Sequence, residues 1–250
     1  MGIRAAGDNR MVELASEIRD YCRAHANPKL VQKYARYFRE GYDAWGLLDR
    51  NHPLWRTKRP EWLERYRDAG LPGFLRLGEL LFSSGKYEEG ALAIQFLKEW
   101  LGQFQAKHLR GLSRWLNAGV NNWAHTDVLC SEVLTPLLTS GTLSLDDFAS
   151  WRESNLKYQR RAVPVAMLGV LKSTTETQEL LSFIRPMMLD AERVVQQGLG
   201  WFLREAWKKN PEPVEAFLME WKDRSPRLIF QYATEKMTPA TRGRFRKTRA

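Results

Sequence analysis

This sequence has few cysteines and no long apolar run. It has two cysteines in 250 residues, Cys22 and Cys130, too few for a disulfide-stabilised scaffold or a four-cysteine zinc site. It has no uninterrupted apolar run of about 18 residues, the length that a membrane-spanning helix needs. The first ten residues, MGIRAAGDNR, lack the apolar core of a secretory signal. We therefore expect a cytoplasmic protein that does not insert into a membrane.

Signatures of metal and nucleotide sites are also missing from the sequence. The histidines are scattered, with no His-x-x-x-His pair, at His25, His52, His108 and His125. This spacing does not match a zinc site, and no glycine-rich phosphate loop follows a strand pattern. We expect His125 to be a surface or interfacial side chain rather than a catalytic base. We also expect no metal and no cofactor.

Positive charge is in excess. Lys and Arg number 39 against 29 Asp and Glu, which gives a formal net charge of +10. The excess favours a polyanionic partner, nucleic acid first, although an anionic membrane surface or solubility alone would explain the same composition. The last nine residues contain five cations and no acid, namely Arg242, Arg244, Arg246, Lys247 and Arg249. Such a tail either stays solvated or holds phosphates without reading base sequence.

Apolar residues recur at helical spacing along nearly the whole chain, and no segment alternates as a strand does. The pattern predicts helices over 11–25, 29–41, 60–69, 72–83, 87–101, 105–117, 122–138, 145–152, 156–171, 176–188, 191–209, 212–223 and 226–237. With 44% hydrophobic residues, the chain has enough apolar surface for a core. We expect a flexible N-terminus over 1–10, one helical domain over 11–237 and a basic tail over 238–250.

Three long predicted helices recur at a nearly constant spacing. They cover 122–138, 156–171 and 191–209, so they begin 34 and 35 residues apart, with a shorter helix between each pair. A single bundle and a stack of helix pairs both suit an all-helical chain, but this spacing is typical of helix-pair repeats. The sequence therefore predicts an all-α fold: a right-handed superhelical solenoid of antiparallel HEAT-like helix pairs, whose concave face binds extended partners.

The same three helices contain the candidate functional residues. Trp123 and Asp127 are four residues apart, so one helical turn places both on the same face. Arg160 and Arg161 begin the next long helix, and Trp201 lies in the third. Each has an ordinary structural explanation, since tryptophans pack in cores, aspartates cap helices and surface arginines stay solvated or paired. If equivalent helices stack, however, an acid, two indoles and a guanidinium converge on one surface.

Four sequence blocks resemble those of a known family. They are ARYFREGYDAWGL at 35–47, NNWAHTD at 121–127, NLKYQRRAV at 155–163 and GWFLREAWKKNP at 200–211. In this order and spacing they make the chain similar to the AlkD family of bacterial HEAT-like DNA-alkylation-repair glycosylases. The resemblance covers most of the chain. It implies an enzyme of base excision repair that removes N3- and N7-alkylated purines from duplex DNA without a cofactor.

The resemblance also implies roles for individual residues. Asp127 would be the carboxylate essential for base excision, and Trp123 and Trp201 would be aromatic walls around the deoxyribose of the lesion. Arg160 would hold the DNA backbone and support Asp127. Tyr37 would be a further DNA contact.

The third block departs from the family pattern. Lys157 stands where the family usually has an aromatic residue, and the adjacent Arg161 is an alternative to Arg160. Pro164 clashes with the carbonyl group of Arg160, so we expect a kink that re-aims the arginine. The expected DNA-binding residues are Tyr37, Lys157, Arg161, Arg242, Arg244, Arg246 and Lys247.

The implied chemistry suits these side chains. Alkylation at N3 or N7 makes a purine cationic and a good leaving group, so the barrier lies in the positive charge that develops on the sugar. A carboxylate beside the sugar stabilises this charge and positions water, while indole faces add cation–π attraction. Unlike glycosylases that flip the target base, the family holds the lesion without a base-specific pocket.

Two other function classes stay open at this point. A non-catalytic DNA-binding or repair-scaffold protein can have the same fold, because fold does not dictate function. A helical-repeat adaptor that binds other proteins is the third possibility, and DNA affinity that falls steeply with salt would argue against it. We expect a monomer whose partner is double-stranded DNA containing alkylated purines.

Overall fold

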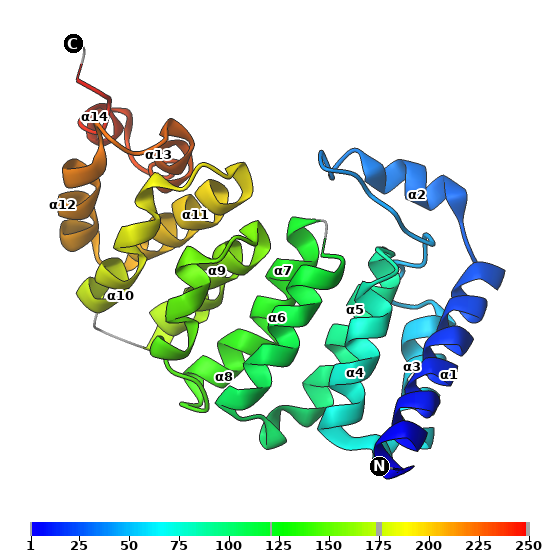
Figure 1. Ribbon diagram of the computed structural model, residues 1–250. Helices are drawn as coiled ribbons and strands as arrows, with labels where there is room; N and C mark the ends of the chain where they lie inside the picture. The colour runs from blue at the N-terminus through cyan, green and yellow to red at the C-terminus, as the bar shows by residue number, and fades with distance from the viewer. Residues whose placement is uncertain (1, 121, 174–176, 249–250) are drawn as a thin grey trace. The chain divides into compact units, whose positions relative to one another are not determined.

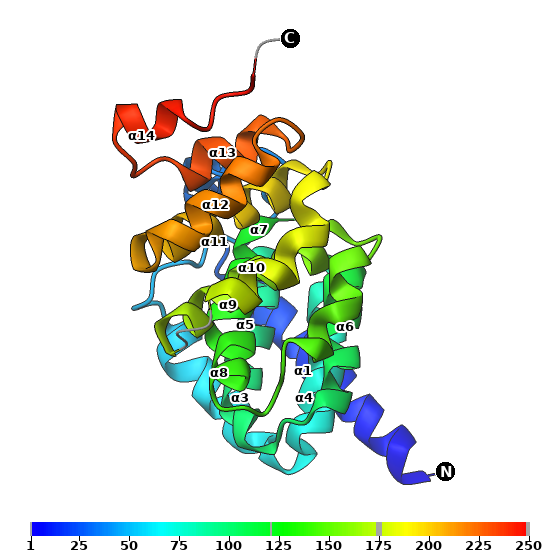
Figure 2. The ribbon, with the colours of Figure 1, turned by 90° about the vertical axis from the view of Figure 1, so that its left-hand side faces the viewer.

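The computed structural model describes residues 2–120, 122–173 and 177–248, and every regular element in these ranges is a helix (Figure 1, Figure 2). The predicted all-α class is therefore confirmed. The chain divides into two compact units, residues 1–133 and 134–250. In the ranges described, no helix combines the length and apolar character needed to cross a membrane.

The first unit is centred on helix α4. Its helices are α1 (Gly2–Ala24), α2 (Pro28–Ala35), α3 (Arg59–Arg65), α4 (Gly70–Phe82), α5 (Tyr87–Leu97), α6 (Leu109–Ala118) and α7 (Trp123–Leu129). Helix α4 packs against α1, α5 and α6, while α7 packs against α5. Leu77 and Leu81, one helical turn apart, are both fully buried on α4. Each such side chain contributes about 1.5–3 kcal/mol to folding.

The second unit is centred on helix α11. Its helices are α8 (Thr135–Thr139), α9 (Lys157–Ser173), α10 (Thr177–Ile184), α11 (Arg193–Lys209), α12 (Pro211–Trp221), α13 (Arg227–Ala233) and α14 (Pro239–Gly243). Helix α11 packs against both α9 and α13. A Cβ atom at Gly200 would lie 2.5 Å from Tyr232 Cβ and 2.7 Å from the Ile229 carbonyl oxygen. Only glycine therefore permits this close approach of α11 and α13.

Helix ends differ from the predictions in several places. Helix α1 begins at Gly2 rather than at residue 11, because the apolar pattern that marks a helix in the sequence starts only at Met11. Helix α2 ends at Ala35 rather than at residue 41. The predicted helix over 122–138 is interrupted by the π-helical turn Cys130–Leu134. A single domain over 11–237 stays a prediction.

The C-terminal segment is folded against the second unit. Helix α14 forms within it, and Phe245 is fully buried. The Arg227 guanidinium donates to the Phe245 carbonyl at 2.8 Å, and the Thr248 amide donates to the Asp223 carboxylate at 2.7 Å. The basic residues predicted for a tail therefore lie on a structured segment, except Arg249, which lies outside the described residues.

Candidate functional site

Helix α7 presents Trp123 and Asp127 on one face. The Asn122 side chain caps the helix by accepting the His125 amide at 3.1 Å, which fixes Trp123 in the first turn. Trp123 is 38% exposed and Asp127 is half-buried, while Ala124, His125 and Thr126 between them are buried. The spacing of four residues thus places an indole and a carboxylate together on the accessible side of the helix.

His125 lies on the opposite, inner side of α7 and has a structural role. Its Nε2 is 2.7 Å from the Tyr87 carbonyl oxygen and its Nδ1 is 3.3 Å from the Asn122 amide nitrogen. Its ring stacks on that of Tyr87 at 4.7 Å. Burial lowers the pKa of His125 to about 4, so the ring is neutral near pH 7. The prediction of an interfacial histidine fits, whereas a surface position is wrong.

Trp123 rests on a stack of aromatic rings. Its ring lies 5.6 Å from that of Phe38, with 19° between the planes, and Phe38 stacks in turn on Tyr42 at 4.5 Å and 11°. Tyr87 closes the group at 5.5 Å from Tyr42. Phe38 covers part of the indole and thereby limits its rotation, while the rest of Trp123 stays accessible. Sequence reasoning missed Phe38, although it belongs to the block at 35–47.

Tyr37 is the neighbouring accessible aromatic residue. It is 55% exposed, and the Arg36 guanidinium lies 4.8 Å from its ring and donates to its hydroxyl at 2.8 Å. This pair combines a cation, which attracts phosphates, with a flat ring, on which bases can stack. A DNA contact at Tyr37 stays a prediction.

In the second unit, Arg160 is held by Asp190. Its Nε and Nη2 donate to the two carboxylate oxygens of Asp190 at 2.6 and 3.3 Å, and Nη1 donates to the Ser154 carbonyl at 2.5 Å. The side chains of Arg160 and Asp190 are 16% and 6% exposed. Asp190 also accepts the Glu192 amide at 2.8 Å. Sequence reasoning did not find Asp190, because it lies outside every recognisable block.

Arg161 faces the interior instead. It is 5% exposed, and its Nη1 donates to the Val194 carbonyl at 2.6 Å. The expectation that Arg161 contacts DNA does not fit this burial, because a phosphate contact needs an accessible guanidinium. Lys157 is half-buried, with its ammonium 5.3 Å from the Tyr158 ring. Helix α9 continues through Pro164.

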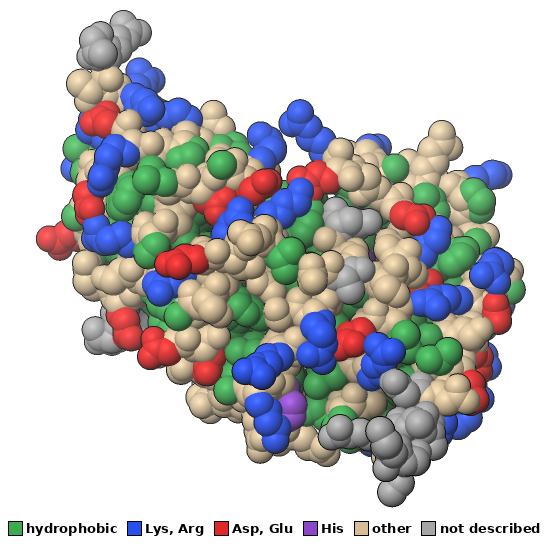
Figure 3. Space-filling model, in the orientation of Figure 1, with side chains coloured by type: hydrophobic (Ala, Val, Ile, Leu, Met, Phe, Trp, Pro, Cys, Tyr) green, Lys and Arg blue, Asp and Glu red, His purple; other side chains and the backbone are tan. Residues whose placement is uncertain are grey.

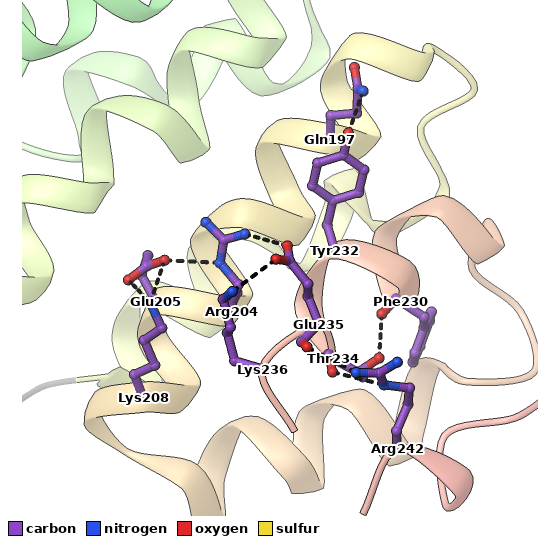
Figure 4. A network of polar contacts seen from close by, with 10 residues as sticks. All are labelled: Gln197, Arg204, Glu205, Lys208, Phe230, Tyr232, Thr234, Glu235, Lys236 and Arg242. Carbon is purple, nitrogen blue, oxygen red and sulfur yellow. Dashed lines mark hydrogen bonds and ion pairs between the residues drawn. The ribbon is translucent and has the colours of Figure 1, made fainter. Parts of the chain in front are cut away.

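Trp201 lies on α11 and is half-buried. Figure 4 shows polar contacts from α11 to α13 and to the turn that follows it. Gln197, one turn before it, donates to the Tyr232 hydroxyl at 2.8 Å. Arg204, about one turn after it, donates to Glu205 at 3.0 Å and to Glu235 at 2.6 Å. These contacts on both sides of Trp201 fix the segment of α11 that carries it.

The cations of the C-terminal segment are unequal. Arg242 donates to the carbonyl groups of Thr234 at 3.1 Å and Glu235 at 2.9 Å, as Figure 4 also shows. Arg244 pairs with Glu215 at 2.7 Å. These bonds help to hold the segment in place, while both arginines stay exposed and have further N–H donors, so DNA contacts from them stay predictions. Arg246 and Lys247 are exposed.

The predicted site residues are thus distributed over both units. Tyr37, Trp123 and Asp127 belong to the first unit, and Arg160 and Trp201 to the second. Over the described ranges, no three His, Cys, Asp or Glu side chains gather in a way that could hold a metal ion.

One family model matches this chain. It is that of the DNA alkylation repair enzymes, and the match extends over residues 18–237. The matched range includes α2, α7, α9 and α11, and with them every predicted site residue outside the C-terminal segment. No curated protein matches the sequence.

Proposed function

Since this chain belongs to the DNA alkylation repair enzyme family, we propose that it is a DNA glycosylase that excises cationic N3- or N7-alkylated purines from duplex DNA. Membership of the family indicates a role in the repair of alkylated DNA. The glycosylase reaction is the finer proposal. The observation that supports it best is the pairing of Trp123 and Asp127 on the accessible face of α7.

Asp127 would act on the sugar rather than on the base. A purine alkylated at N3 or N7 leaves readily because it is already cationic, so the step that needs help is formation of a positively charged sugar. A carboxylate beside that sugar stabilises the charge and positions the attacking water. The N-glycosidic bond breaks, its electron pair leaves with the purine, and water supplies the hydroxyl group at the sugar carbon while its other proton passes to the Asp127 carboxylate.

Trp123 would support the same transition state. An indole face attracts a cation by about 0.5–2 kcal/mol, depending on how far the site is desolvated. The stack on Phe38 and Tyr42 holds the ring in one orientation, so little entropy is lost when the sugar meets it. In this proposal no base-specific pocket is needed.

The second unit would contribute Arg160 and Trp201 on the family's pattern. A guanidinium has more N–H donors than the three bonds of Arg160 to Asp190 and Ser154 use. The remaining donors suit a DNA phosphate. Trp201 would be the second aromatic wall, fixed by the neighbouring contacts of Gln197 and Arg204.

We also propose that the helices form a right-handed solenoid of HEAT-like pairs. Support comes from the second unit, where α9, α11 and α13 pack in succession and α10 contacts α12, as stacked helix pairs do. A single domain, a monomeric state and a cytoplasmic location belong to the same proposal.

Base release from duplex DNA containing 7-methylguanine tests the proposed function. Wild type is compared with Asp127→Asn, which keeps the size of the side chain and removes its charge, and with Asp146→Asn at an exposed aspartate of the second unit. We expect release by wild type and Asp146→Asn, and near-complete loss in Asp127→Asn with DNA binding retained. Equal release by all three would remove Asp127 from the chemistry.

A protein that binds DNA but releases no base would be a scaffold rather than an enzyme. To reach that conclusion, the assay must also fail with 3-methyladenine and with a bulkier cationic adduct. Salt-sensitive binding of undamaged duplex in the same samples shows that the protein is folded and active as a DNA-binding protein.

A further inference from the structure

Helix α2 and the turn after it form a segment of one charge sign. Between Asn27 and Arg39 the chain has four cations and no acid, namely Lys29, Lys33, Arg36 and Arg39. All four are exposed, and α2 buries none of its side chains. In Figure 1, α2 stands apart from α1, α3 and α5 of the same unit, and blue side chains project over it in Figure 3.

These cations differ from most others of the first unit in having no acidic partner among the residues that the structure describes. Cations on other helices pair with carboxylates, for example Arg10 with Asp68 at 2.6 Å and Arg59 with Glu99 at 3.0 Å. Within the described ranges, no ion pair involves Lys29, Lys33 or Arg39. Unneutralised charge of this density favours a polyanion.

The segment is nevertheless firmly anchored at its base. The Asn27 amide donates to the Trp45 carbonyl at 2.7 Å. Gly46 has a φ of +83°, and a Cβ there would lie 2.2 Å from the Asn27 carbonyl oxygen, so only glycine fits. The buried Glu88 accepts the amides of Trp45, Gly46 and Leu47 at 2.8 Å each. An anchored helix presents its charges at fixed positions, unlike a disordered tail.

Phe38 connects this segment to the candidate excision site. It lies between Tyr37 and Arg39 in the chain, and its ring stacks on Trp123. The stack therefore brings the C-terminal end of this segment to the indole of Trp123. A DNA strand that reaches Trp123 would pass next to these cations.

We propose that residues 28–39, called the α2 strip from here on, bind the phosphates of duplex DNA beside Trp123. The inference rests on the proposed function and extends it to a surface that supplies affinity rather than chemistry. Phosphates are the fitting occupant because the strip offers separate, exposed cations and a flat exposed ring at Tyr37.

Salt dependence of binding tests the strip directly. Each phosphate that a cation neutralises contributes about 0.9 to the slope of log affinity against log salt concentration. The triple variant Lys29→Ala, Lys33→Ala, Arg39→Ala should therefore lower the magnitude of that slope by about 2–3. Lys29 and Lys33 lie on an exposed helix, which alanine suits, and Arg39 lies in an exposed turn, so the fold should persist, as circular dichroism would confirm. The probe is an undamaged duplex, followed by fluorescence anisotropy over a potassium chloride series.

Two matched variants separate the strip from net charge. Arg56→Ala, Lys107→Ala, Arg110→Ala removes three exposed cations of the same unit and should leave the slope close to that of wild type. Lys29→Arg, Lys33→Arg, Arg39→Lys keeps every charge and should restore the wild-type slope. Equal loss in both alanine triples would overturn the proposal, because it would show an effect of net charge alone.

Failure of the strip and failure of the proposed function are distinguishable. If wild type binds duplex and releases 7-methylguanine but the strip triple keeps the wild-type slope, only the strip is wrong. If wild type neither binds duplex nor releases base, both are wrong. Polyglutamate can be compared with unlabelled duplex of equal charge as a competitor for the strip. If polyglutamate competes equally well, the result favours an acidic protein partner and overturns the assignment to DNA.

Discussion

Two cationic segments of this chain have similar compositions and different bonding partners. The α2 strip has four cations and the last nine residues have five, with no acid in either segment. The strip cations are exposed and have no carboxylate partner among the described residues. In the C-terminal segment, Arg242 is bonded to backbone carbonyls, Arg244 is paired with Glu215, and Phe245, which follows Arg244, is buried.

The difference shows that charge density in a sequence does not say whether the charge is available. The concentration of cations in the C-terminal segment led to the prediction that it binds DNA. In the structure, two of these cations bond to the second unit and help to hold the segment in place. The cations of the α2 strip were not predicted to bind DNA, because apolar and aromatic residues separate them in the sequence. We therefore expect the α2 strip to contribute to DNA affinity and the C-terminal segment to contribute mainly to stability.

The largest expected effect is on stability. Phe245→Ala should lower the free energy of unfolding by about 3–5 kcal/mol, because it empties a fully buried site. The strip triple should change it by less than about 1 kcal/mol, because its side chains are exposed. Urea unfolding of both variants measures the two values. A Phe245→Ala protein as stable as wild type would mean that the C-terminal segment is not folded onto the second unit in solution.

Acid should weaken the contacts of His125, in the first unit, and of Asp223, near the C-terminus, at different pH values. An unfolded histidine has a pKa of about 6.5, and burial lowers the pKa of folded His125 to about 4. The stability linked to His125 is therefore complete above about pH 6.5 and is lost as the pH falls towards 4, by up to about 1.4 kcal/mol per unit. Near the C-terminus, the hydrogen bond from Lys222 lowers the pKa of Asp223 to about 2, so its contact with Thr248 is lost only when the pH falls towards that value.

Urea unfolding between about pH 7 and pH 4.5, a range that spans the His125 transition, tests this difference. The stability of wild type should fall across the range, whereas that of His125→Asn should start lower and depend less on pH. The strip triple is the control and should follow wild type. A His125→Asn protein with the full pH dependence of wild type would assign that dependence to other groups.

A smaller effect should appear at Arg160, whose surroundings are intermediate between the two segments. Asp190 holds it, yet its side chain stays 16% exposed. If Asp190 positions Arg160 for one phosphate, Asp190→Asn should lower the salt slope by about 0.9. Arg160→Ala should have the same effect, and the double variant should lower the slope no further. A steeper slope in Asp190→Asn would show instead that Asp190 competes with DNA for Arg160.

Much of the helical fold can be predicted from the sequence, because apolar periodicity reports which face of a helix is buried. The predicted helices over 156–171 and 191–209 correspond closely to Lys157–Ser173 and Arg193–Lys209. The π-helical turn at Cys130–Leu134 was not foreseen, since one extra residue in a turn barely changes the apolar pattern. The early start of α1 was missed because the sequence before Met11 has no apolar stripe.

The candidate site was only partly predictable, because a sequence pattern reports local spacing and not contacts between distant segments. The spacing of Trp123 and Asp127 is local, so helical geometry alone places them together. The burial of Arg161, the bond from Arg160 to Asp190 and the stack of Phe38 on Trp123 depend on contacts between segments far apart in the chain. No local pattern encodes such contacts.

We propose that base excision depends on Asp127, whereas the α2 strip supplies affinity for DNA. Single-turnover release of 7-methylguanine at saturating protein tests it most directly, for wild type, Asp127→Asn and the strip triple. We expect the strip triple to release the base at the wild-type rate and Asp127→Asn to release almost none. Wild-type release by Asp127→Asn, or loss of release in the saturated strip triple, would contradict it.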